Sequence, residues 1–117
     1  MKKKFIIMGL LLSFAAIAVF AQAQRFNPGT YTATADGYNG PLTVSVVVDA
    51  SRITAITITS HNDTPGFVNR VTTARNNMVG RMIAAQSAEV DVVTGATGTS
   101  NGLKAAVRTA LAQATRN

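Results

Sequence analysis

The sequence predicts a small α+β domain, in which an antiparallel β-meander packs against two helices in the order β-β-β-α-β-α. Two observations carry this prediction: three strand-like runs are separated by short turns, and two later runs have apolar residues at helical spacing. A length of 117 residues suits one domain. The chain has no cysteine, which excludes disulfides, thiolate metal sites and thiol catalysis.

The strand-like runs follow one another in the first half of the chain. Tyr31–Ala35 alternates with threonines and predicts the first strand, and Leu42–Val48 predicts the second. Arg52–Ser60 is rich in isoleucine and threonine and predicts the third. The second run places Leu42, Val44, Val46 and Val48 on one face. That face is too apolar for water, so we expect helices to cover it.

The second half of the chain has helical periodicity. One helix is expected where apolar residues recur at helical spacing, with Gly80 weakening it by about 1 kcal/mol. The residues of this stripe are Phe67, Val71, Ala74, Met78 and Met82. Val90–Val93 predicts a brief extended segment. Thr99 or Ser100 is expected to cap a final helix. Its apolar stripe is Leu103, Val107, Ala110, Leu111 and Ala114.

The N-terminus has the pattern of a secretory signal. Lys2, Lys3 and Lys4 precede an uncharged run over residues 5–21, and Ala21-Gln22-Ala23 supplies small residues for cleavage. We therefore predict a signal peptide over residues 1–23 and a mature domain over 24–117. The alternative is an uncleaved membrane anchor, although the run is shorter than the roughly 20 residues that span a bilayer. Both readings predict an exported protein, periplasmic or extracellular.

Removal of the three lysines lowers the net charge from +6 to +3. The remaining basic residues are spread out and lack the aromatic interleaving of nucleic-acid surfaces, so no nucleic-acid partner is expected.

The segment from Thr94 to Ser100 can receive an anion. Its glycines let the backbone approach a ligand closely, and its threonines present hydroxyls. The free N–H groups of the following helix favour a phosphate at this loop. The spacing fits neither a Walker loop nor a dinucleotide-binding fingerprint. An ordinary glycine turn followed by a helix cap explains the residues alone at least as well.

A second candidate segment runs from His61 to Phe67. Pro65-Gly66 sets a turn, and the following Phe67 could form one wall of a site for a flat ring. The simpler interpretation is a loop and helix start, with Phe67 in the core. His61 is the only histidine, which makes a poor metal site and an incomplete catalytic triad. We predict no metal ligands and no catalytic residues.

Four motifs, taken in order, resemble the FMN-binding domain family over about Gly29 to Ala114. They are Gly37-Tyr38-x-Gly40-Pro41-Leu42-x-Val44, His61-Asn62-Asp63-Thr64-Pro65-Gly66, Gln86-Ser87, and Val90-Asp91-x-Val93-Thr94-Gly95-Ala96-Thr97-x-Thr99-Ser100-Asn101. The family includes flavin-carrying extracytoplasmic subunits of sodium-pumping quinone reductases and related ferredoxin-linked redox complexes.

The resemblance implies FMN as cofactor and a flavin transferase that attaches it through its phosphate to Thr97. Asp91 then serves transferase recognition, and Thr94 fills the first position of the attachment motif. Thr64-Pro65-Gly66 is similar to the segment against the isoalloxazine, flanked by Phe67 and His61. The implied cofactor-binding residues are Thr97, Thr94, Gly95, Ala96, Gly98, Thr99, Ser100, Thr64, Pro65, Gly66, Phe67 and His61.

Two positions depart from the family pattern. Asp63 stands where glutamate is usual, and we expect little consequence. Gly98 is smaller than the commoner apolar residue, which predicts a less covered ring.

These observations predict an exported single-domain flavoprotein that shuttles electrons between redox partners outside the cytoplasm. It is expected to be an electron carrier that needs an unidentified donor and acceptor, not an enzyme by itself. It contacts a membrane only if the N-terminal segment stays uncleaved. Two alternatives remain: a secreted module that binds FMN or another phosphorylated ligand noncovalently, and a structural domain that binds nothing.

Overall fold

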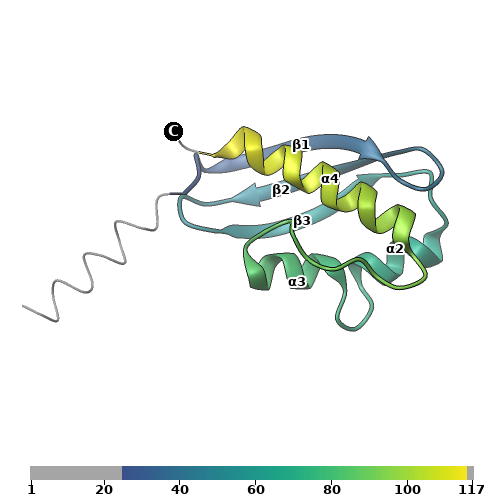
Figure 1. The fold of residues 1–117 in the computed structure, drawn as a ribbon. Coiled ribbons are helices and arrows are strands. Elements are labelled where there is room, and N and C mark those ends of the chain that lie inside the picture. Colours follow the sequence, from purple (N-terminus) through teal and green to yellow (C-terminus); the bar gives the residue numbers. More distant parts are fainter. Residues whose placement is uncertain (1–24, 116–117) are drawn as a thin grey trace, which may run out of the picture.

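The computed structural model describes residues 25–115, and these form a three-stranded sheet with three helices on it (Figure 1). The α+β class and the β-meander are confirmed. The predicted signal segment lies outside the described residues. The elements are β1 (Gly29–Asp36), β2 (Pro41–Val48), β3 (Ile53–Ser60), α2 (Pro65–Thr72), α3 (Met78–Ala85) and α4 (Thr97–Ala114).

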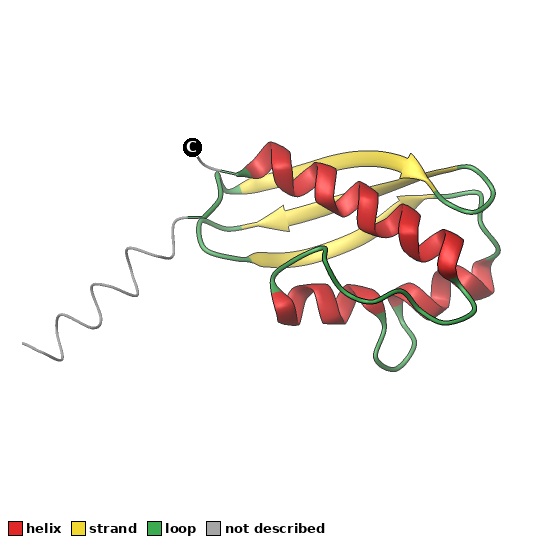
Figure 2. Ribbon diagram, viewed as in Figure 1, coloured by secondary structure: helices red, strands yellow, loops and turns green. Residues whose placement is uncertain are grey.

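The sheet is antiparallel with the order β1-β2-β3. In its central strand, Leu42, Val44, Val46 and Val48 are all buried, as the alternation predicted. Val46 pairs with Tyr31 of β1 on one side and with Ile56 of β3 on the other. The core therefore lies on one face of the sheet, between the strands and the helices (Figure 2).

Helix α4 lies across β1 and β2 and supplies the second layer of the core. Gly102 explains how close the helix comes. A Cβ at this position would lie 2.6 Å from the carbonyl oxygen of Asp36 and 2.7 Å from the Cα of Gly37. The helix therefore touches the end of β1 backbone to backbone, which fixes its first turns against the β1–β2 turn. The buried side chains on this helix include Leu103, Ala106, Val107, Ala110 and Ala114.

The prediction of one helix through Met82 was wrong, because α2 and α3 are separate helices. The break lies at residues 73–77, not at Gly80. Asn76 has a left-handed backbone with φ of 57°, which ends helical geometry there. Asn77 then caps α3, and its side-chain oxygen accepts a hydrogen bond of 2.8 Å from the Gly80 N–H. Gly80 lies inside α3 and does not interrupt it.

The prediction of an extended strand at Val90–Val93 was also wrong, so the observed order is β-β-β-α-α-α. Side chains replace a strand partner here. The Arg81 guanidinium donates to the Asp91 carbonyl at 2.9 Å, and the Val93 N–H donates to the Ser100 hydroxyl at 3.1 Å. The predicted cap of α4 needs correction too, because the helix starts at Thr97, with Ala96 at the N-cap position.

Gln86 pairs with the first residue of β3 at the free edge of the sheet. Its side-chain oxygen accepts from the Ile53 N–H at 2.6 Å, and its amide nitrogen donates to the Ile53 carbonyl at 3.1 Å. The same nitrogen donates to the Ile83 carbonyl at 2.7 Å. Gln86 has a left-handed backbone at the C-cap of α3. Its amide therefore mimics a neighbouring strand and joins the helical layer to the sheet edge.

Across residues 25–115, no helix combines the length and the apolar character that a bilayer crossing requires.

We predict that Gln86→Ala lowers the free energy of unfolding by about 1–3 kcal/mol, because it leaves part-buried backbone groups of β3 unpaired. Gln113→Ala is the matched control, since Gln113 is exposed and donates only to the Thr32 carbonyl at 3.2 Å. Urea unfolding of both variants measures the difference. Equal losses in the two variants would contradict the role assigned to Gln86.

Candidate functional site

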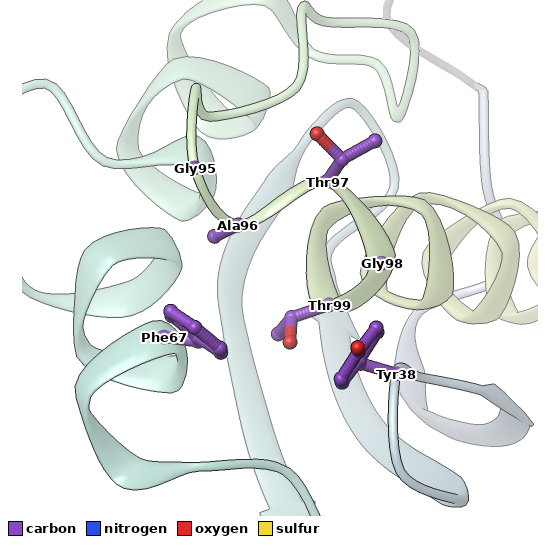
Figure 3. Close-up of a pocket in the computed structure, with 7 residues that line it drawn as sticks. All are labelled: Tyr38, Phe67, Gly95, Ala96, Thr97, Gly98 and Thr99. Atoms are coloured by element: carbon purple, nitrogen blue, oxygen red, sulfur yellow. The ribbon is translucent and has the colours of Figure 1, made fainter.

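A cavity of about 340 Å³ opens at the end of the domain where α4 and α2 begin. Its size falls within the roughly 300–1,000 Å³ typical of small-molecule sites. The wall comes from three segments distant in sequence: the β1–β2 turn, the first turn of α2, and the loop into α4 (Figure 3). The lining residues are Tyr38, Phe67, Gly95, Ala96, Thr97, Gly98 and Thr99.

The loop into α4 brings backbone N–H groups to the cavity. Gly95 has φ of +87°, a conformation that favours glycine, and it turns the chain so that α4 starts at Thr97. A Cβ at Gly95 would also lie 2.8 Å from the Arg70 guanidinium. The N–H groups of the first turn of this 18-residue helix and the Arg70 charge both favour an anion beside the loop.

Thr97 lies at the rim of the cavity. It is exposed, and Figure 3 shows its hydroxyl directed away from the space between Phe67 and Tyr38. Thr99, two residues further along, is instead buried, and its hydroxyl donates to the Asp63 carboxylate. The two hydroxyls therefore differ. That of Thr97 is accessible from outside, and that of Thr99 is hydrogen-bonded within the fold.

Phe67 forms one wall of the cavity from the first turn of α2, which begins at Pro65. Pro65 occupies the first turn, where its missing N–H costs nothing. The Thr64 carbonyl accepts from the Phe67 N–H at 2.9 Å. The Phe67 ring is half-buried, with the Arg70 guanidinium 5.9 Å from its centroid. A planar apolar surface thus faces the cavity beside a positive charge.

Asp63 anchors the opposite wall. Its carboxylate accepts hydrogen bonds from the Thr99 hydroxyl at 2.5 Å, the Tyr38 N–H at 3.0 Å and the Asn39 N–H at 2.7 Å. Asp63 is only 4% exposed. Burial raises the pKa of this carboxyl, but the hydrogen bonds from Thr99, Asn39 and Tyr38 outweigh burial, so the pKa is lowered. The buried carboxylate therefore ties the β1–β2 turn to the first turn of α4.

The structure brings only part of the predicted set to the cavity. Phe67 and the residues from Gly95 to Thr99 line it. Thr64, Pro65 and Gly66 do not line it but set the start of the helix that carries Phe67. Ser100 is buried and holds the Val93 N–H. Thr94 is exposed beside the lining residues.

His61 and Asp91 also lie outside the cavity lining. The Nδ1 atom of His61 is buried and has no hydrogen-bond partner among the described residues. Asp91 is exposed, and only its backbone carbonyl is engaged, by Arg81.

Two residues of the site were not predicted from the sequence: Tyr38 as a lining residue and Asp63 as an anchor. Tyr38 is an aromatic residue in the turn between Gly37 and Gly40, where the Gly37 N–H donates to the Gly40 carbonyl. That position was a usable signal. Asp63 gave no such signal, because its partners lie 24, 25 and 36 residues away in the chain.

We predict that Asp63→Asn lowers the free energy of unfolding at pH 7 by about 1–3 kcal/mol, because an amide cannot accept all three hydrogen bonds. The lowered pKa means that the carboxylate stabilises the fold above its ordinary value of 3.8, and that this contribution disappears as pH falls below it. The difference in free energy of unfolding between the wild type and Asp63→Asn should therefore become smaller at acidic pH.

Denaturant unfolding at several pH values measures this difference. Asp49→Asn is the matched control, since the Asp49 carboxylate accepts from the Ser51 and Arg52 N–H groups in an exposed turn, and its loss should cost less. A stability difference between the wild type and Asp63→Asn that stays constant down to pH 3 would contradict the role of Asp63 as an anchor.

The sequence of this chain matches a known protein family. Residues 37–112 match the FMN-binding domain family. An uncharacterized protein of Treponema pallidum is 35% identical over 98 residues, which are 80% of this chain and 26% of that protein. The NADH:acrylate oxidoreductase of Vibrio harveyi is 32% identical over 79 residues, which are 68% of this chain and 8% of that protein.

The chain spans about a quarter of the first relative and under a tenth of the second, so the similarity concerns one domain of longer proteins. The family match covers all of the segments that build the cavity. A cavity with aromatic walls, beside an N–H-rich loop and the Arg70 guanidinium of α2, fits a flat ring that carries a phosphate. The chain belongs to the FMN-binding domain family, and FMN is its cofactor.

Proposed function

We propose that this protein is an exported flavoprotein that carries FMN on Thr97 through a phosphodiester and shuttles electrons between extracytoplasmic redox partners. The observation that supports the attachment most directly is the position of Thr97. Its side chain is exposed at the rim of the cavity, at the first residue of α4. A modifying enzyme can reach this hydroxyl without unfolding the domain.

The attachment balances as a phosphoryl transfer. Thr97 Oγ1 loses its proton and bonds to the phosphorus of an activated flavin donor, whose leaving group departs. The net gain is one FMN less one water. The resulting phosphodiester keeps one negative charge, which the N-terminus of α4 stabilises by about 0.3–1 kcal/mol. The Arg70 guanidinium beside Gly95 adds a second favourable charge.

A flavin transferase is then required as a partner. Asp91 lies six residues before Thr97, and its exposed carboxylate is accessible to such an enzyme. The residues between them, from Val93 to Ala96, are held by the Ser100 hydroxyl and by the Ala96 N–H bond to the Val93 carbonyl at 3.0 Å. These two bonds restrain the segment that leads to Thr97.

Bound FMN supplies the redox chemistry, and the chain binds and orients it. Phe67 and the α4 loop, which line the cavity, would hold the cofactor there. The Vibrio harveyi relative is an oxidoreductase by name, which supports a role in electron transfer for the domain shared with it. The electron donor and acceptor of this chain are separate redox partners.

Export is supported by the N-terminal sequence. Three lysines, an uncharged run over residues 5–21 and an A-x-A site have the order of a signal peptide. The domain would be periplasmic or extracellular, and membrane-anchored if the segment is retained.

The second candidate function is a module that holds FMN noncovalently without electron transfer. The cavity itself favours this alternative, because two aromatic walls and an anion-favouring loop can bind FMN without a bond. Denaturation separates the two: a phosphodiester survives it, and noncovalent FMN is released.

We predict that protein coproduced with a flavin transferase has an intact mass raised by one FMN less water, and that its colour remains in denaturant. Thr97→Ala should abolish this retained flavin. Intact mass spectrometry and visible absorbance of the denatured sample make the measurement. Thr109→Ala is the matched control, because Thr109 is an exposed threonine of the same helix far from the cavity.

Two results would count against attachment at Thr97. Flavin retained in denatured Thr97→Ala would place the bond elsewhere. An unmodified wild-type mass, with colour lost in denaturant, would favour the noncovalent module. The wild-type mass also shows whether the chain begins at Gln24.

A further inference from the structure

The geometry points to Tyr38 as a cofactor-binding residue whose ring forms the face on which the flavin stacks, with Gly98 as the residue that makes room for it. Neither position belongs to the attachment chemistry. The inference rests on the FMN site of the proposed function, but not on the covalent bond.

The Tyr38 ring is exposed, and packing against its neighbours does not bury it. The residue is 68% exposed, the highest value among the large exposed hydrophobic residues of the described chain. Single exposed apolar residues are common on protein surfaces. Tyr38 differs because its ring borders the cavity, on the side opposite Phe67 (Figure 3). Both aromatic rings therefore flank the same space.

The turn that carries the exposed Tyr38 ring is held in place by hydrogen bonds. The Tyr38 and Asn39 N–H groups both donate to the buried Asp63 carboxylate, and the Gly37 N–H donates to the Gly40 carbonyl at 2.7 Å. A Cβ at Gly37 would lie 2.6 Å from that carboxylate, so the turn is pressed against Asp63. The backbone that carries the ring is therefore already in place before a ligand binds, which lowers the entropy cost of binding.

Gly98 is explained by the Tyr38 ring and not by its own backbone. It has no left-handed conformation, and glycine in a helix costs about 1 kcal/mol relative to alanine. A Cβ at this position would lie 2.7 Å from Cδ1 and 2.9 Å from the Cβ of Tyr38. A larger residue would push the ring out of its place at the cavity. Because Gly98 is small, the Tyr38 ring can cover the bound ring in place of a larger apolar side chain at position 98.

Aromatic rings prefer offset stacking or edge-to-face contact with other π-systems. The flavin ring system is flat and aromatic, so it can meet Tyr38 on one side of the cavity while Phe67 borders the other. A phenol in contact with a photoexcited flavin donates an electron to it and takes it back, with no net reaction. This cycle quenches flavin fluorescence, whereas a phenyl ring is too difficult to oxidise to do so.

The amino-acid composition leaves few other side chains that could quench the flavin. The chain has no tryptophan and only two tyrosines, Tyr38 and Tyr31. Tyr31 lies on β1, and its hydroxyl donates to the Asn27 carbonyl at 2.8 Å, at the opposite end of the strand from the cavity. We expect Tyr38→Phe to lengthen the fluorescence lifetime of bound FMN several-fold. Tyr31→Phe, the matched control, should leave the lifetime of the wild type unchanged.

A second pair of variants tests Gly98. Gly98→Ala should displace the Tyr38 ring and lengthen the lifetime. Gly80→Ala, also inside a helix, meets only ordinary contacts of 3.5 Å or more and should change nothing. A Tyr38→Phe lifetime equal to that of the wild type, at equal flavin loading, would overturn the role of Tyr38. An unchanged lifetime in Gly98→Ala would overturn the role of Gly98.

Intact mass on the same samples keeps the two proposals apart. Where the mass shows no covalent flavin, attachment at Thr97 has failed, and the lifetimes are then measured with FMN added to the protein. Tyr38 quenching under that condition would support the stacking role alone. Protein that takes up no FMN, covalently or from solution, would overturn both.

Discussion

The buried carboxylate of Asp63 joins three parts of the chain that the site requires. It holds the Tyr38–Asn39 turn through two N–H groups and the first turn of α4 through the Thr99 hydroxyl, while its own backbone leads into α2. Hydrogen bonds to a charged group contribute about 1.5–3 kcal/mol each, and a buried charge without them is strongly destabilising. The arrangement therefore tolerates little loosening: the two aromatic walls and the α4 loop keep their places together.

Some side chains of the site are hydrogen-bonded within the fold, and others are accessible to a ligand. Thr99 and Ser100 use their hydroxyls inside the fold, on Asp63 and on the Val93 N–H. Thr97 is exposed at the start of α4, where the helix N-terminus and Arg70 favour an anion. Tyr38 and Phe67 offer flat apolar surfaces on the cavity. This division suits a carrier domain, whose chemistry resides in its cofactor and whose own task is to hold it.

The sequence was most informative where side-chain periodicity decides structure. The alternation of Leu42 to Val48 predicted the central strand and its buried face. The apolar stripe through Met78 predicted helix but not its interruption, because the left-handed Asn76 and the cap at Asn77 depend on local geometry rather than on hydrophobicity. Val90–Val93 has strand-forming residues, yet side chains from Arg81 and Ser100 bind its backbone instead. Asp63 could not be placed, because its role depends on contacts between segments far apart in the chain. Tyr38 did leave a signal, as an aromatic residue in a glycine-containing turn.

The measurement that tests the account most directly is the location of the flavin on the protein. Trypsin cleaves after Arg81 and Lys104, so one peptide from Met82 to Lys104 contains the whole attachment segment. Tandem mass spectrometry of flavin-loaded protein should find the added mass of one FMN less water on this peptide, on Thr97. Flavin on a peptide outside the segment, or on Thr94, Thr99 or Ser100 within it, would contradict the account.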